Sequence, residues 1–395
     1  MGTWDLGLGT WEKYAQDPRP KPQDPGPKTT CYYPLVKKLR VGIVFGGKSG
    51  EHEVSVTSAG SIFKHIDRGK YEPIAIKIEK DGQWTLPDQP PMALSAAEVI
   101  QQAKTATGKS QALGGGEPAV LGALNLDVVF PVLHGPYGED GTIQGLLELA
   151  NVPYVGPGVL ASAAGMDKAV MRVLFAARGL PLCAWRGFVR ADWERSRARV
   201  LDDLQPLGLP MFVKPANLGS SVGISKVKSP IDLVPAIELA LEFDRKVVVE
   251  AGVPNAREIE CAVLGNDEPE ASLPGEIIPS REFYDYEAKY LDDDSKSVIP
   301  ADLPAATVAR VKTLSIEAFR AIDAAGLARV DFLLARDTGE IVLNEINTMP
   351  GFTSISMYSK MWDASGVHYA ALVDRLIQLG IERHNQKQKL KTSVV

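Results

Sequence analysis

Two apolar runs near the C-terminus carry oxygen-bearing side chains at the spacing of a β-strand. Arg329 and Asp331 are two residues apart in the first run, and Glu345 and Asn347 are two residues apart in the second. In an extended strand such residues point to one face, and the residues between them point to the other. Carboxylate and amide oxygens suit Mg²⁺, which takes further ligands from water and phosphate. The spacing therefore predicts a magnesium-nucleotide site. The residues expected to face a core are Val330, Phe332, Val342 and Ile346.

A half-buried sheet with solvated charges on its outer face would also explain each of these pairs. The second run, however, ends directly in Met349-Pro350-Gly351. Turns that follow a strand in this way often carry functional residues. For any one pair the plain sheet is the favoured interpretation, and this context weakens it in support of the metal site.

The segment Gly219-Ser220-Ser221-Val222-Gly223 is typical of a phosphate-binding loop. Glycines let backbone N–H groups approach phosphate oxygens, and the serine hydroxyls add donors. Lys214 ends the preceding apolar run and adds positive charge. A simple hairpin turn is the alternative. The phosphate loop is favoured because Lys168, Glu250 and Glu258 also lie at the ends of elements that flank it.

Residues 42–49 satisfy the P-loop pattern of nucleoside triphosphatases letter for letter. In a true P-loop the residues after the first glycine form a loop, whereas Ile43, Val44 and Phe45 are apolar and typical of the strand itself. In Leu126-Asp127-Val128 the acid precedes an apolar run instead of ending it, so no partner motif is evident. We expect the match to be accidental.

The strand and helix patterns around these residues predict a multidomain chain of α/β and α+β class. Residues 1–38 are rich in proline and are expected to form a disordered extension. Alternating strand and helix patterns over 39–160 predict an open, Rossmann-like α/β domain. Further elements over 161–252 and 253–382 predict two more domains, and residues 383–395 are expected to fray. Expected strands lie at 40–47, 74–78, 127–133, 209–215, 246–250, 258–264, 327–334 and 341–347, and expected helices at 55–66, 166–178, 304–325 and 369–379.

Composition narrows the class of protein. The chain has 395 residues, a 45% hydrophobic fraction and a net charge of -6. This length exceeds one comfortable core, so a cleft between domains is expected. The negative charge disfavours nucleic acid and anionic membrane surfaces as partners. Cys31, Cys183 and Cys261 lack metal or disulfide spacing, and neither a secretory signal nor a transmembrane run is evident, so we expect a cytoplasmic protein.

Six ordered motifs make the chain resemble the ATP-grasp superfamily and, within it, the D-alanine:D-alanine ligase family. The resemblance covers about 39–379 and implies that a two-lobed ATP-grasp fold follows the N-terminal domain. The motifs are Glu51-His52-Glu53-Val54-Ser55, His134-Gly135-Pro136-Tyr137-Gly138-Glu139-Asp140-Gly141, Met166-Asp167-Lys168, Lys214-Pro215 with Gly219-Ser220-Ser221-Val222-Gly223, Tyr284-Asp285-Tyr286-Glu287-Ala288-Lys289-Tyr290, and Asn344-Glu345-Ile346-Asn347-Thr348.

The resemblance implies a reaction and its ligands. ATP would phosphorylate the carboxylate of one D-alanine, and the amine of a second would attack the acylphosphate to give D-alanyl-D-alanine for peptidoglycan precursors. Two Mg²⁺ ions, or Mn²⁺, would assist, and the protein would be a homodimer. Residues 39–160 would bind the first D-alanine, 161–252 would be the central lobe, and 253–382 would hold the metal and the second substrate.

By the same resemblance, nucleotide and metal have separate sets of side chains. Lys168 and Lys214 would hold the phosphates and the adenine edge, while Glu250 would lie by the adenine. Glu258 would bind the ribose hydroxyls. The implied nucleotide set is Lys168, Lys214, Ser221, Glu250, Glu258 and Asn344, and the implied metal set is Asp331, Glu345 and Asn347.

For the first D-alanine, the resemblance implies that Glu53 binds the ammonium group, with His134 nearby. Ser220 would link this site to Tyr290 by a hydrogen bond. Structural roles would also suit these residue types, since Glu53 could cap a helix and His134 could lie in a core. The ordered motif set favours the functional roles.

For the second D-alanine, the resemblance implies that Ser356 and Lys289 hold the carboxylate. Arg329 and the backbone N–H of Gly351 would stabilise the oxyanion of the tetrahedral intermediate. Both groups are hydrogen-bond donors, which suits them to stabilise developing negative charge. These roles would place all the second-substrate residues in the C-terminal lobe.

A D-alanine:D-lactate ligase is the nearest alternative. Such enzymes carry a histidine in the segment that reads the second nucleophile, whereas this chain has Glu287-Ala288-Lys289-Tyr290 there and no histidine between His134 and His368. Dipeptide synthesis is therefore favoured.

A non-catalytic ATP-binding regulator with the same fold is an alternative of another class. Such a protein would have no use for an amino-acid site, so the presence of Glu53, Ser220 and Tyr290 together with Glu345 and Asn347 favours the enzyme.

Overall fold

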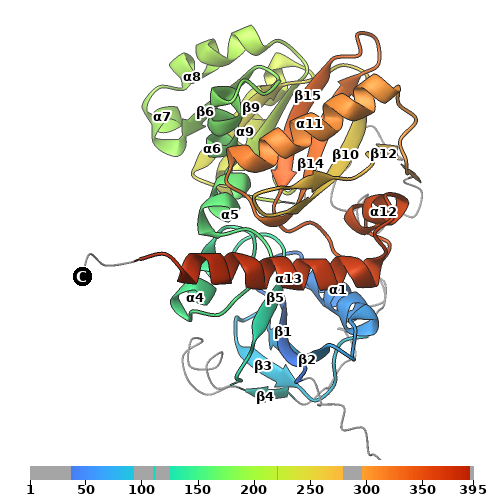
Figure 1. Ribbon diagram of the computed structural model, residues 1–395. Helices are drawn as coiled ribbons and strands as arrows, with labels where there is room; N and C mark the ends of the chain where they lie inside the picture. The colour runs from blue at the N-terminus through green and yellow to red at the C-terminus, as the bar shows by residue number, and fades with distance from the viewer. Residues whose placement is uncertain (1–36, 93–109, 113–123, 220, 279–295, 392–395) are drawn as a thin grey trace, which may run out of the picture. The chain divides into compact units, whose positions relative to one another are not determined.

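The computed structural model describes residues 37–92, 110–112, 124–219, 221–278 and 296–391, which form three sheets with flanking helices (Figure 1). One sheet has a parallel centre and the other two are antiparallel, as expected for a chain of α/β and α+β class. The sheets fall within the expected domains 39–160, 161–252 and 253–382, whose limits remain predictions. The extension expected at 1–38 lies, up to residue 36, outside the described residues.

The N-terminal sheet has the order β4 (Ser110–Ala112), β3 (Trp84–Pro87), β2 (Tyr71–Ile78), β1 (Leu39–Gly46) and β5 (Val128–Val132). Its helices are α1 (His52–His65), α4 (Thr142–Leu149) and α13 (Tyr369–Gln388). Val41, Ile43 and Phe45 pack with residues of α1 and α13, whereas Val44 packs with residues of α4. Burial on both faces explains the continuous apolar run of β1.

The P-loop-like segment 42–49 begins inside this sheet. Ile43, Val44 and Phe45 belong to β1, which pairs in parallel with β2 on one side and with β5 on the other. Backbone groups used in two sheet ladders are not available to surround a phosphate. The expectation that the match is accidental is confirmed.

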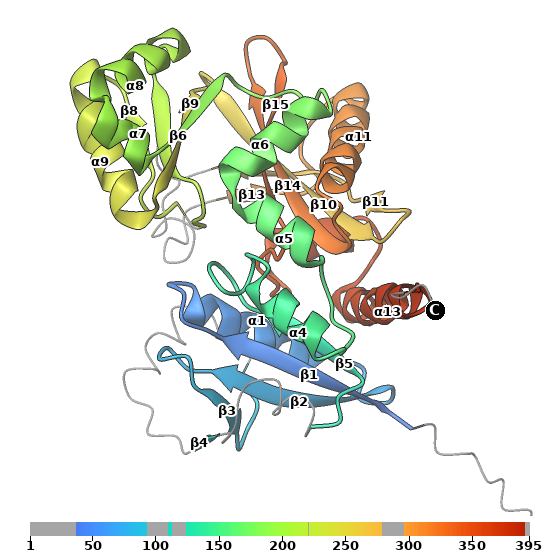
Figure 2. The ribbon, with the colours of Figure 1, turned by 90° about the vertical axis from the view of Figure 1, so that its left-hand side faces the viewer.

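The central sheet has the order β6 (Trp185–Val189), β9 (Lys246–Ala251), β7 (Met211–Pro215) and β8 (Ser225–Val227). The helical segments of this region are α7 (Arg190–Arg195), α8 (Arg197–Leu204), η1 (Gln205–Leu207), η2 (Pro230–Asp232) and α9 (Leu233–Phe243). Val213 and Val249 pack with Ile237 of α9, on the side that Figure 2 shows covered by helices. Lys214 and Glu250 are the next residues in their strands, so they point to the other face.

The C-terminal sheet has the order β13 (Lys296–Val298), β12 (Gly275–Ile278), β10 (Ala256–Gly265), β14 (Gly326–Ala335) and β15 (Ile341–Asn347), and β11 (Glu270–Ala271) pairs with β10. Its helices are α5 (Val159–Met166), α6 (Lys168–Ala177) and α11 (Ala305–Ala321). Ile259, Cys261 and Val330 are buried in one cluster with Phe319 of α11. The alternate residues of these strands, among them Glu260 and Asp331, therefore face away from the helices.

A β-bulge corrects one sequence expectation about β15. Asp331 lies opposite Glu345, but the next residue, Phe332, lies opposite Leu343, so Asn344 is an extra residue in the ladder. Because the bulge reverses the alternation, Leu343 joins the core cluster of the helix-covered face, while the expected Val342 is buried outside that cluster. Val330, Phe332 and Ile346 face the core as expected.

Helix limits also differ from the sequence expectations: α1 begins at His52 and not at 55, and α11 ends at Ala321 and not at 325. The segment expected as one helix at 166–178 contains the end of α5 and all of α6, because Asp167 caps α6 by accepting hydrogen bonds from the N–H groups of Ala169 and Val170.

Helix α13 runs to Gln388, past the expected end at 379 and into the tail expected to fray. Arg383 lies 4.1 Å from the centre of the Tyr154 ring, and Lys387 forms an ion pair with Glu148 of α4. These contacts with the N-terminal domain add stability to the extra turns, which the sequence of the tail alone did not reveal.

Candidate functional site

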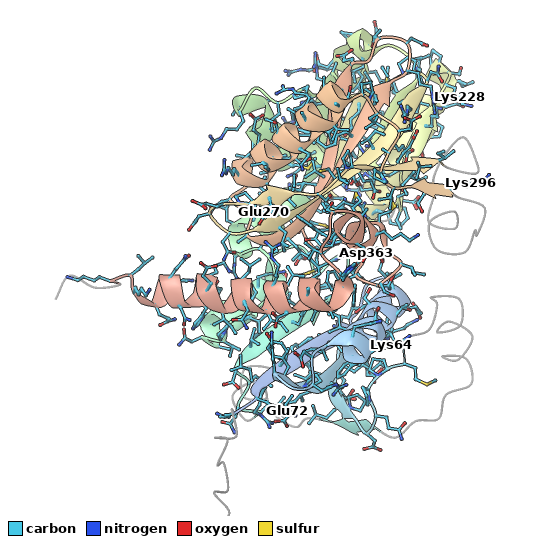
Figure 3. All side chains as sticks on the ribbon, turned by 45° about the vertical axis from the view of Figure 1, so that its right-hand side comes forward. Lys64, Glu72, Lys228, Glu270, Lys296 and Asp363 are labelled. Atoms are coloured by element: carbon cyan, nitrogen blue, oxygen red, sulfur yellow. The ribbon has the colours of Figure 1, made fainter. Side chains whose placement is uncertain are left out.

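A cavity of about 820 Å³ is lined by residues of α1 and of the central and C-terminal sheets. This volume lies within the range of about 300–1,000 Å³ that ligand pockets usually have. Two lysines that line it, Lys64 on α1 and Lys296 on β13, are labelled in Figure 3. The expected site residues that line the cavity are His134, Lys168, Lys214, Ser221, Glu250, Glu258, Arg329, Asp331, Asn344, Glu345, Asn347, Gly351 and Ser356.

The remaining expected site residues do not line it in the described structure. Ser220, Lys289 and Tyr290 lie outside the described residues, so their roles stay predictions. Glu53 is described, but it does not line the cavity, and its Oε1 lies 2.6 Å from Lys80 Nζ. Burial alone would raise the pKa of Glu53, but Lys80 outweighs that effect and lowers it.

Glu51 lines the cavity in the region expected for Glu53. A Cβ atom added at Gly135 would lie 3.0 Å from Glu51 Oε2, and one added at Gly219 would lie 3.4 Å from the same oxygen. The carboxylate is therefore close both to the turn after β5 and to the expected phosphate loop. The motif contains both glutamates, and on a helix residues two apart point to different faces. That rule could have shown that only one of them faces the cavity, but not which one.

A second, half-buried carboxyl group, that of Glu139, lies beside Glu51. Glu139 Oε2 accepts a hydrogen bond of 2.8 Å from the N–H of Gly135. Burial, reinforced by the negative charge of Glu51, raises the pKa of Glu139 to about 8. Glu139 is thus largely protonated at neutral pH. Glu139 belongs to one of the six motifs, but no role was predicted for it from the sequence.

His134 is buried at the same end of the cavity. Its Nδ1 lies 2.9 Å from Met349 O, and because a carbonyl oxygen can only accept, Nδ1 carries the proton. Nε2 has no hydrogen-bond partner among the described residues. Burial lowers the pKa of His134, so the ring is neutral near pH 7 and Nε2 can accept a hydrogen bond from a ligand.

The central sheet and α6 contribute a buried charge cluster. Glu250 Oε2 lies 2.8 Å from Lys214 Nζ, and Glu250 Oε1 accepts a 2.7 Å hydrogen bond from Nε of Arg172. Burial by itself would raise the pKa of Glu250, but the two cations outweigh it and lower the pKa. Two positive charges face one negative charge, so the cluster keeps positive charge that an anionic ligand can use. Arg172, which lies in α6 between the buried Met171 and Phe175, was not predicted as a site residue from the sequence.

Lys168 connects the expected phosphate loop to the C-terminal sheet. Its Nζ donates a 2.7 Å hydrogen bond to Leu218 O and lies 3.9 Å from Glu345 Oε2. Ser221, in the same loop, has a φ of 60°, a left-handed conformation that turns the chain sharply. The geometry thus places a lysine and a sharply turned glycine-serine segment next to an acidic side chain.

The acidic side chains form a row across the C-terminal sheet. Glu260 lies opposite Asp331, which lies opposite Glu345, so the three carboxylates share one face. Arg329 reduces their repulsion, because its Nε and Nη2 each donate a 2.7 Å hydrogen bond to Asp331 and Nε lies 3.2 Å from Glu260 Oε2. Although burial opposes it, the charges of Asp331 and Glu260 raise the pKa of Arg329. Glu260 was not among the site residues predicted from the sequence.

The donor types in this row fit Mg²⁺. Asp331 and Glu345 supply carboxylate oxygens, and Asn347 supplies an amide whose Nδ2 donates a 2.8 Å hydrogen bond to Asp331 Oδ2. In the described part of the chain, no group of three or more His, Cys, Asp or Glu side chains is close enough to hold a metal by itself. That suits an ion that takes several ligands from water and from nucleotide phosphates.

Gly351 and Ser356 lie close together where the turn after β15 lines the cavity. A Cβ added at Gly351 would lie 3.6 Å from Ser356 Oγ, and that oxygen accepts a 3.0 Å hydrogen bond from the N–H of Thr353. Ser356 precedes helix α12 (Met357–Ala364), whose N-terminus favours negative charge. This part of the cavity is suited to a carboxylate.

None of the helices in the described part of the chain combines the length and the apolar character that crossing a bilayer requires.

Two protein-family models match the chain. The model described as "D-ala D-ala ligase N-terminus" matches residues 40–157, and the model described as "D-ala D-ala ligase C-terminus" matches residues 174–378. The D-alanine--D-alanine ligase of Heliobacterium modesticaldum is 50% identical over 365 residues, which cover 90% of this chain and 98% of that protein. The enzyme of the same name from Bacillus cytotoxicus is 46% identical over 362 residues, covering 90% of this chain and 99% of that protein.

Solved structures with similar folds include the D-alanine-D-alanine ligase from Coxiella burnetii, with a TM-score of 0.75 and 37% identity over 89% of this chain and 96% of that chain. The VanG D-Ala:D-Ser ligase from Enterococcus faecalis has a TM-score of 0.75 and 35% identity over 87% of this chain and all of that chain (100%).

Proposed function

Because the chain belongs to the D-alanine:D-alanine ligase family, we propose that it uses ATP to join two D-alanines into D-alanyl-D-alanine. One observation carries the proposal beyond family membership. Lys168 and Lys214, the acidic row of the C-terminal sheet, and the region of Glu51 and His134 all line the same cavity. A phosphoryl donor and an amino acid can therefore meet there.

The chemistry depends on activating a poor electrophile. A carboxylate oxygen of the first D-alanine takes the γ-phosphoryl group of ATP, and the amine of the second D-alanine then attacks the carbonyl carbon. Phosphate leaves with the electrons of the C–O bond, and the amine loses a proton. The protein must mainly hold anions in place and stabilise charge away from water.

The first D-alanine is assigned to the end of the cavity near α1. Glu51, in place of the expected Glu53, would receive the ammonium group, and Nε2 of the neutral His134 would accept a further hydrogen bond. Glu139 is assigned no direct contact. Ser220 and Tyr290 keep the linking role that the family resemblance implies.

The nucleotide is assigned to the region between the central and C-terminal sheets. Lys168, Lys214 and the loop with Ser221 would bind the phosphates. Glu250 would lie by the adenine, and the remaining nucleotide-binding residues would be Glu258, at the ribose, and Asn344.

Mg²⁺ would be held by Asp331, Glu345 and Asn347, with two ions or Mn²⁺ as the family resemblance implies. When bound, the metal supplies positive charge at the phosphoryl group that is transferred.

The second D-alanine is assigned to the part of the cavity near α12. Ser356 and Lys289 would hold its carboxylate. Arg329 and the N–H of Gly351 would donate to the oxyanion that forms when the amine attacks.

The decisive measurement is phosphate release from ATP by the purified protein, with and without D-alanine, together with mass spectrometry of the product. We expect release that depends on D-alanine and a product of two D-alanines. Release that ignores D-alanine would support the non-catalytic regulator or another reaction and would overturn the proposal.

The second nucleophile is tested in mixtures of D-alanine with D-lactate or D-serine. D-serine is included because the VanG neighbour is a D-Ala:D-Ser ligase. We expect D-alanyl-D-alanine to dominate at neutral pH, and a product containing mainly lactate or serine would reassign the specificity.

Three further properties complete the proposal. We infer that the dipeptide serves peptidoglycan precursor synthesis, that the protein acts in the cytoplasm and that it is a homodimer, as the family resemblance implies. Light scattering of the full chain tests the dimer, and a monomeric mass would refute it.

A further inference from the structure

The segment 349–356, here called the second-substrate loop, follows β15 but is held by helix α1 of the N-terminal domain. The N–H of Phe352 donates a 3.2 Å hydrogen bond to Ser58 Oγ, and the N–H of Ser354 donates a 3.0 Å hydrogen bond to Ser61 Oγ. Both serines are buried. The loop thus takes its position from a helix almost three hundred residues earlier in the chain.

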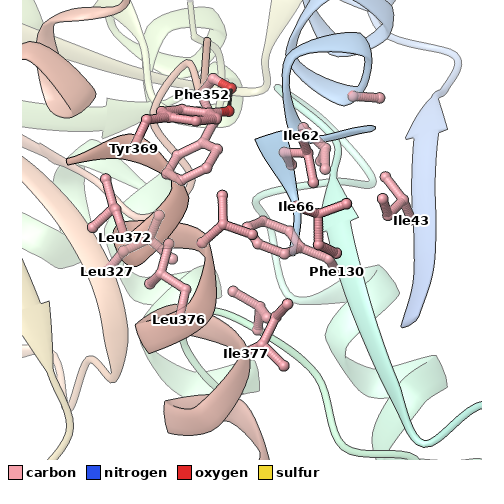
Figure 4. Packing of buried hydrophobic residues seen from close by; sticks show 14 of the residues in the cluster. Ile43, Ile62, Ile66, Phe130, Leu327, Phe352, Tyr369, Leu372, Leu376 and Ile377 are labelled. Atoms are coloured by element: carbon pink, nitrogen blue, oxygen red, sulfur yellow. Dashed lines mark hydrogen bonds between the residues drawn. The ribbon is translucent and has the colours of Figure 1, made fainter. Parts of the chain in front are cut away.

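Two other side chains hold the carbonyl groups of the same loop. The hydroxyl of Tyr369, on α13, donates a 2.8 Å hydrogen bond to Phe352 O, which Figure 4 shows as a dashed line. His134 donates to Met349 O, as described above. The loop is therefore fixed from both sides by groups outside the C-terminal sheet.

Packing supports these hydrogen bonds. The ring of Phe352 lies 5.5 Å from that of Phe130 on β5 and 5.3 Å from that of Tyr369, measured between ring centres. Ile62 of α1 belongs to the same core cluster as Phe352 and Tyr369, and Figure 4 shows the three residues. Phe352 belongs to the core cluster that contains Phe130 and Ile62 of the N-terminal domain, and not to the cluster around α11.

Helix α1 also presents one face to the cavity. Val54, Thr57, Ser61 and Lys64 line it, at the spacing of three or four residues that places side chains on one side of a helix. Glu51, immediately before the helix, lines the same cavity. One rigid element therefore carries both the group proposed for the first substrate and the support for the loop proposed for the second.

We propose that Ser58 and Ser61 are positioning residues for the second D-alanine: they fix the loop that carries Gly351 and Ser356 at a set place relative to Glu51. This inference rests on the proposed function. The chemical consequence is that phosphate release stays coupled to dipeptide formation. If the loop shifts, the amine of the second D-alanine is misaligned and water adds to the acylphosphate carbonyl carbon in its place. Phosphate then leaves, and D-alanine is regenerated without a dipeptide.

The test uses Ser61→Ala in the full chain, with phosphate and dipeptide measured in the same reaction. Loss of the acceptor leaves the N–H of Ser354 unpaired, so we expect KM for the second D-alanine to rise about tenfold. KM for ATP and for the first D-alanine should change less than about twofold. The ratio of phosphate to dipeptide should rise above one. A merely structural role would not change that ratio.

Ser315→Ala is the matched control, because Ser315 is also a buried helical serine, whose hydroxyl donates to Val311 O within α11. It should leave the ratio at one. An unchanged ratio and an unchanged KM for the second D-alanine in Ser61→Ala, or the same changes in Ser315→Ala, would overturn the inference. If Ser61→Ala does not fold, Ser58→Ala decides the question by the same measurements.

Amide hydrogen exchange separates this inference from the proposed function. In Ser61→Ala without substrates, the amide of Ser354 should exchange faster than in the parent protein, and an unchanged rate would refute the support by α1. If the parent protein shows no D-alanine-dependent phosphate release, the proposed function fails, and with it the role toward the second substrate, whatever the exchange rates.

Discussion

Arg329 and Asp331, two residues apart on β14, form a two-point ion pair. Nε of the arginine donates a 2.7 Å hydrogen bond to Oδ1 of the aspartate, and Nη2 donates a 2.7 Å hydrogen bond to Oδ2. The pair lies in the middle of the acidic row with Glu260 and Glu345. The arginine therefore has a structural task as well as the proposed task at the oxyanion.

Replacing this arginine should reveal the structural task. Arg329→Ala removes the cation that pairs with Asp331 and Glu260, so we expect the free energy of unfolding in urea to fall by about 3 kcal/mol. Arg336→Ala is the control, because Arg336 is half-exposed and its pair with Glu276 is long, at 3.9 Å. This variant should change the free energy of unfolding by less than about 0.5 kcal/mol. Equal stability losses in the two variants would contradict a special role for the Arg329 pair.

Glu345 should be required for turnover but not for folding. Glu345→Gln keeps the shape of the side chain but removes a charge proposed to bind Mg²⁺, so we expect kcat to fall at least about 100-fold with an unchanged melting temperature. Glu340→Gln, at an exposed position just before β15, is the matched control and should keep full activity. Normal activity of Glu345→Gln would remove this residue from the mechanism.

Glu51 and Glu53 can be distinguished directly. Glu51→Gln should raise KM for the first D-alanine about 10- to 100-fold, because a charge-assisted hydrogen bond to the ammonium group becomes a neutral one. Glu53→Gln should leave that KM within about threefold, since only the pair with the exposed Lys80 is lost. The reverse pattern would restore Glu53 as the substrate residue.

Glu139 should make stability depend on pH. The pKa of Glu139 is about 8 in the folded protein, above its ordinary value of 4.5, so the folded state holds a proton that the unfolded state releases. Its contribution is fully present below pH 4.5 and is lost as the pH rises towards 8. The parent protein should lose up to about 1.4 kcal/mol per pH unit in this window relative to Glu139→Gln. Urea unfolding at several pH values between 5 and 8 measures this difference, and parallel stability profiles would contradict it.

Strand periodicity was sufficient to predict the acidic face of the C-terminal sheet. Arg329 and Asp331 could be placed on one face because they are two residues apart and their neighbours are apolar. The extra residue Asn344 could not be predicted, because a bulge depends on how two strands pair and not on the sequence of one of them. The same limit hid Glu260, whose strand β10 is far from β14 in the chain.

Helix ends were harder to predict than strand faces. The extension of α13 depends on Arg383 and Lys387 reaching Tyr154 and Glu148, and these are contacts between residues more than two hundred positions apart. The choice between Glu51 and Glu53 likewise depends on which side of α1 faces the cavity. Local patterns carry no information about either.

Strand β1, paired on both sides, has a consequence for how such sequences are classified. A text search for the eight letters at 42–49 would group this protein with GTPase switches and motor ATPases and would direct mutagenesis at Lys48 and Ser49. In the folded chain Ile43, Val44 and Phe45 of that string lie in a buried strand. The lysines proposed to bind the triphosphate, Lys168 and Lys214, lie more than a hundred residues downstream. A motif identifies a nucleotide site only when its letters fall on the right secondary structure.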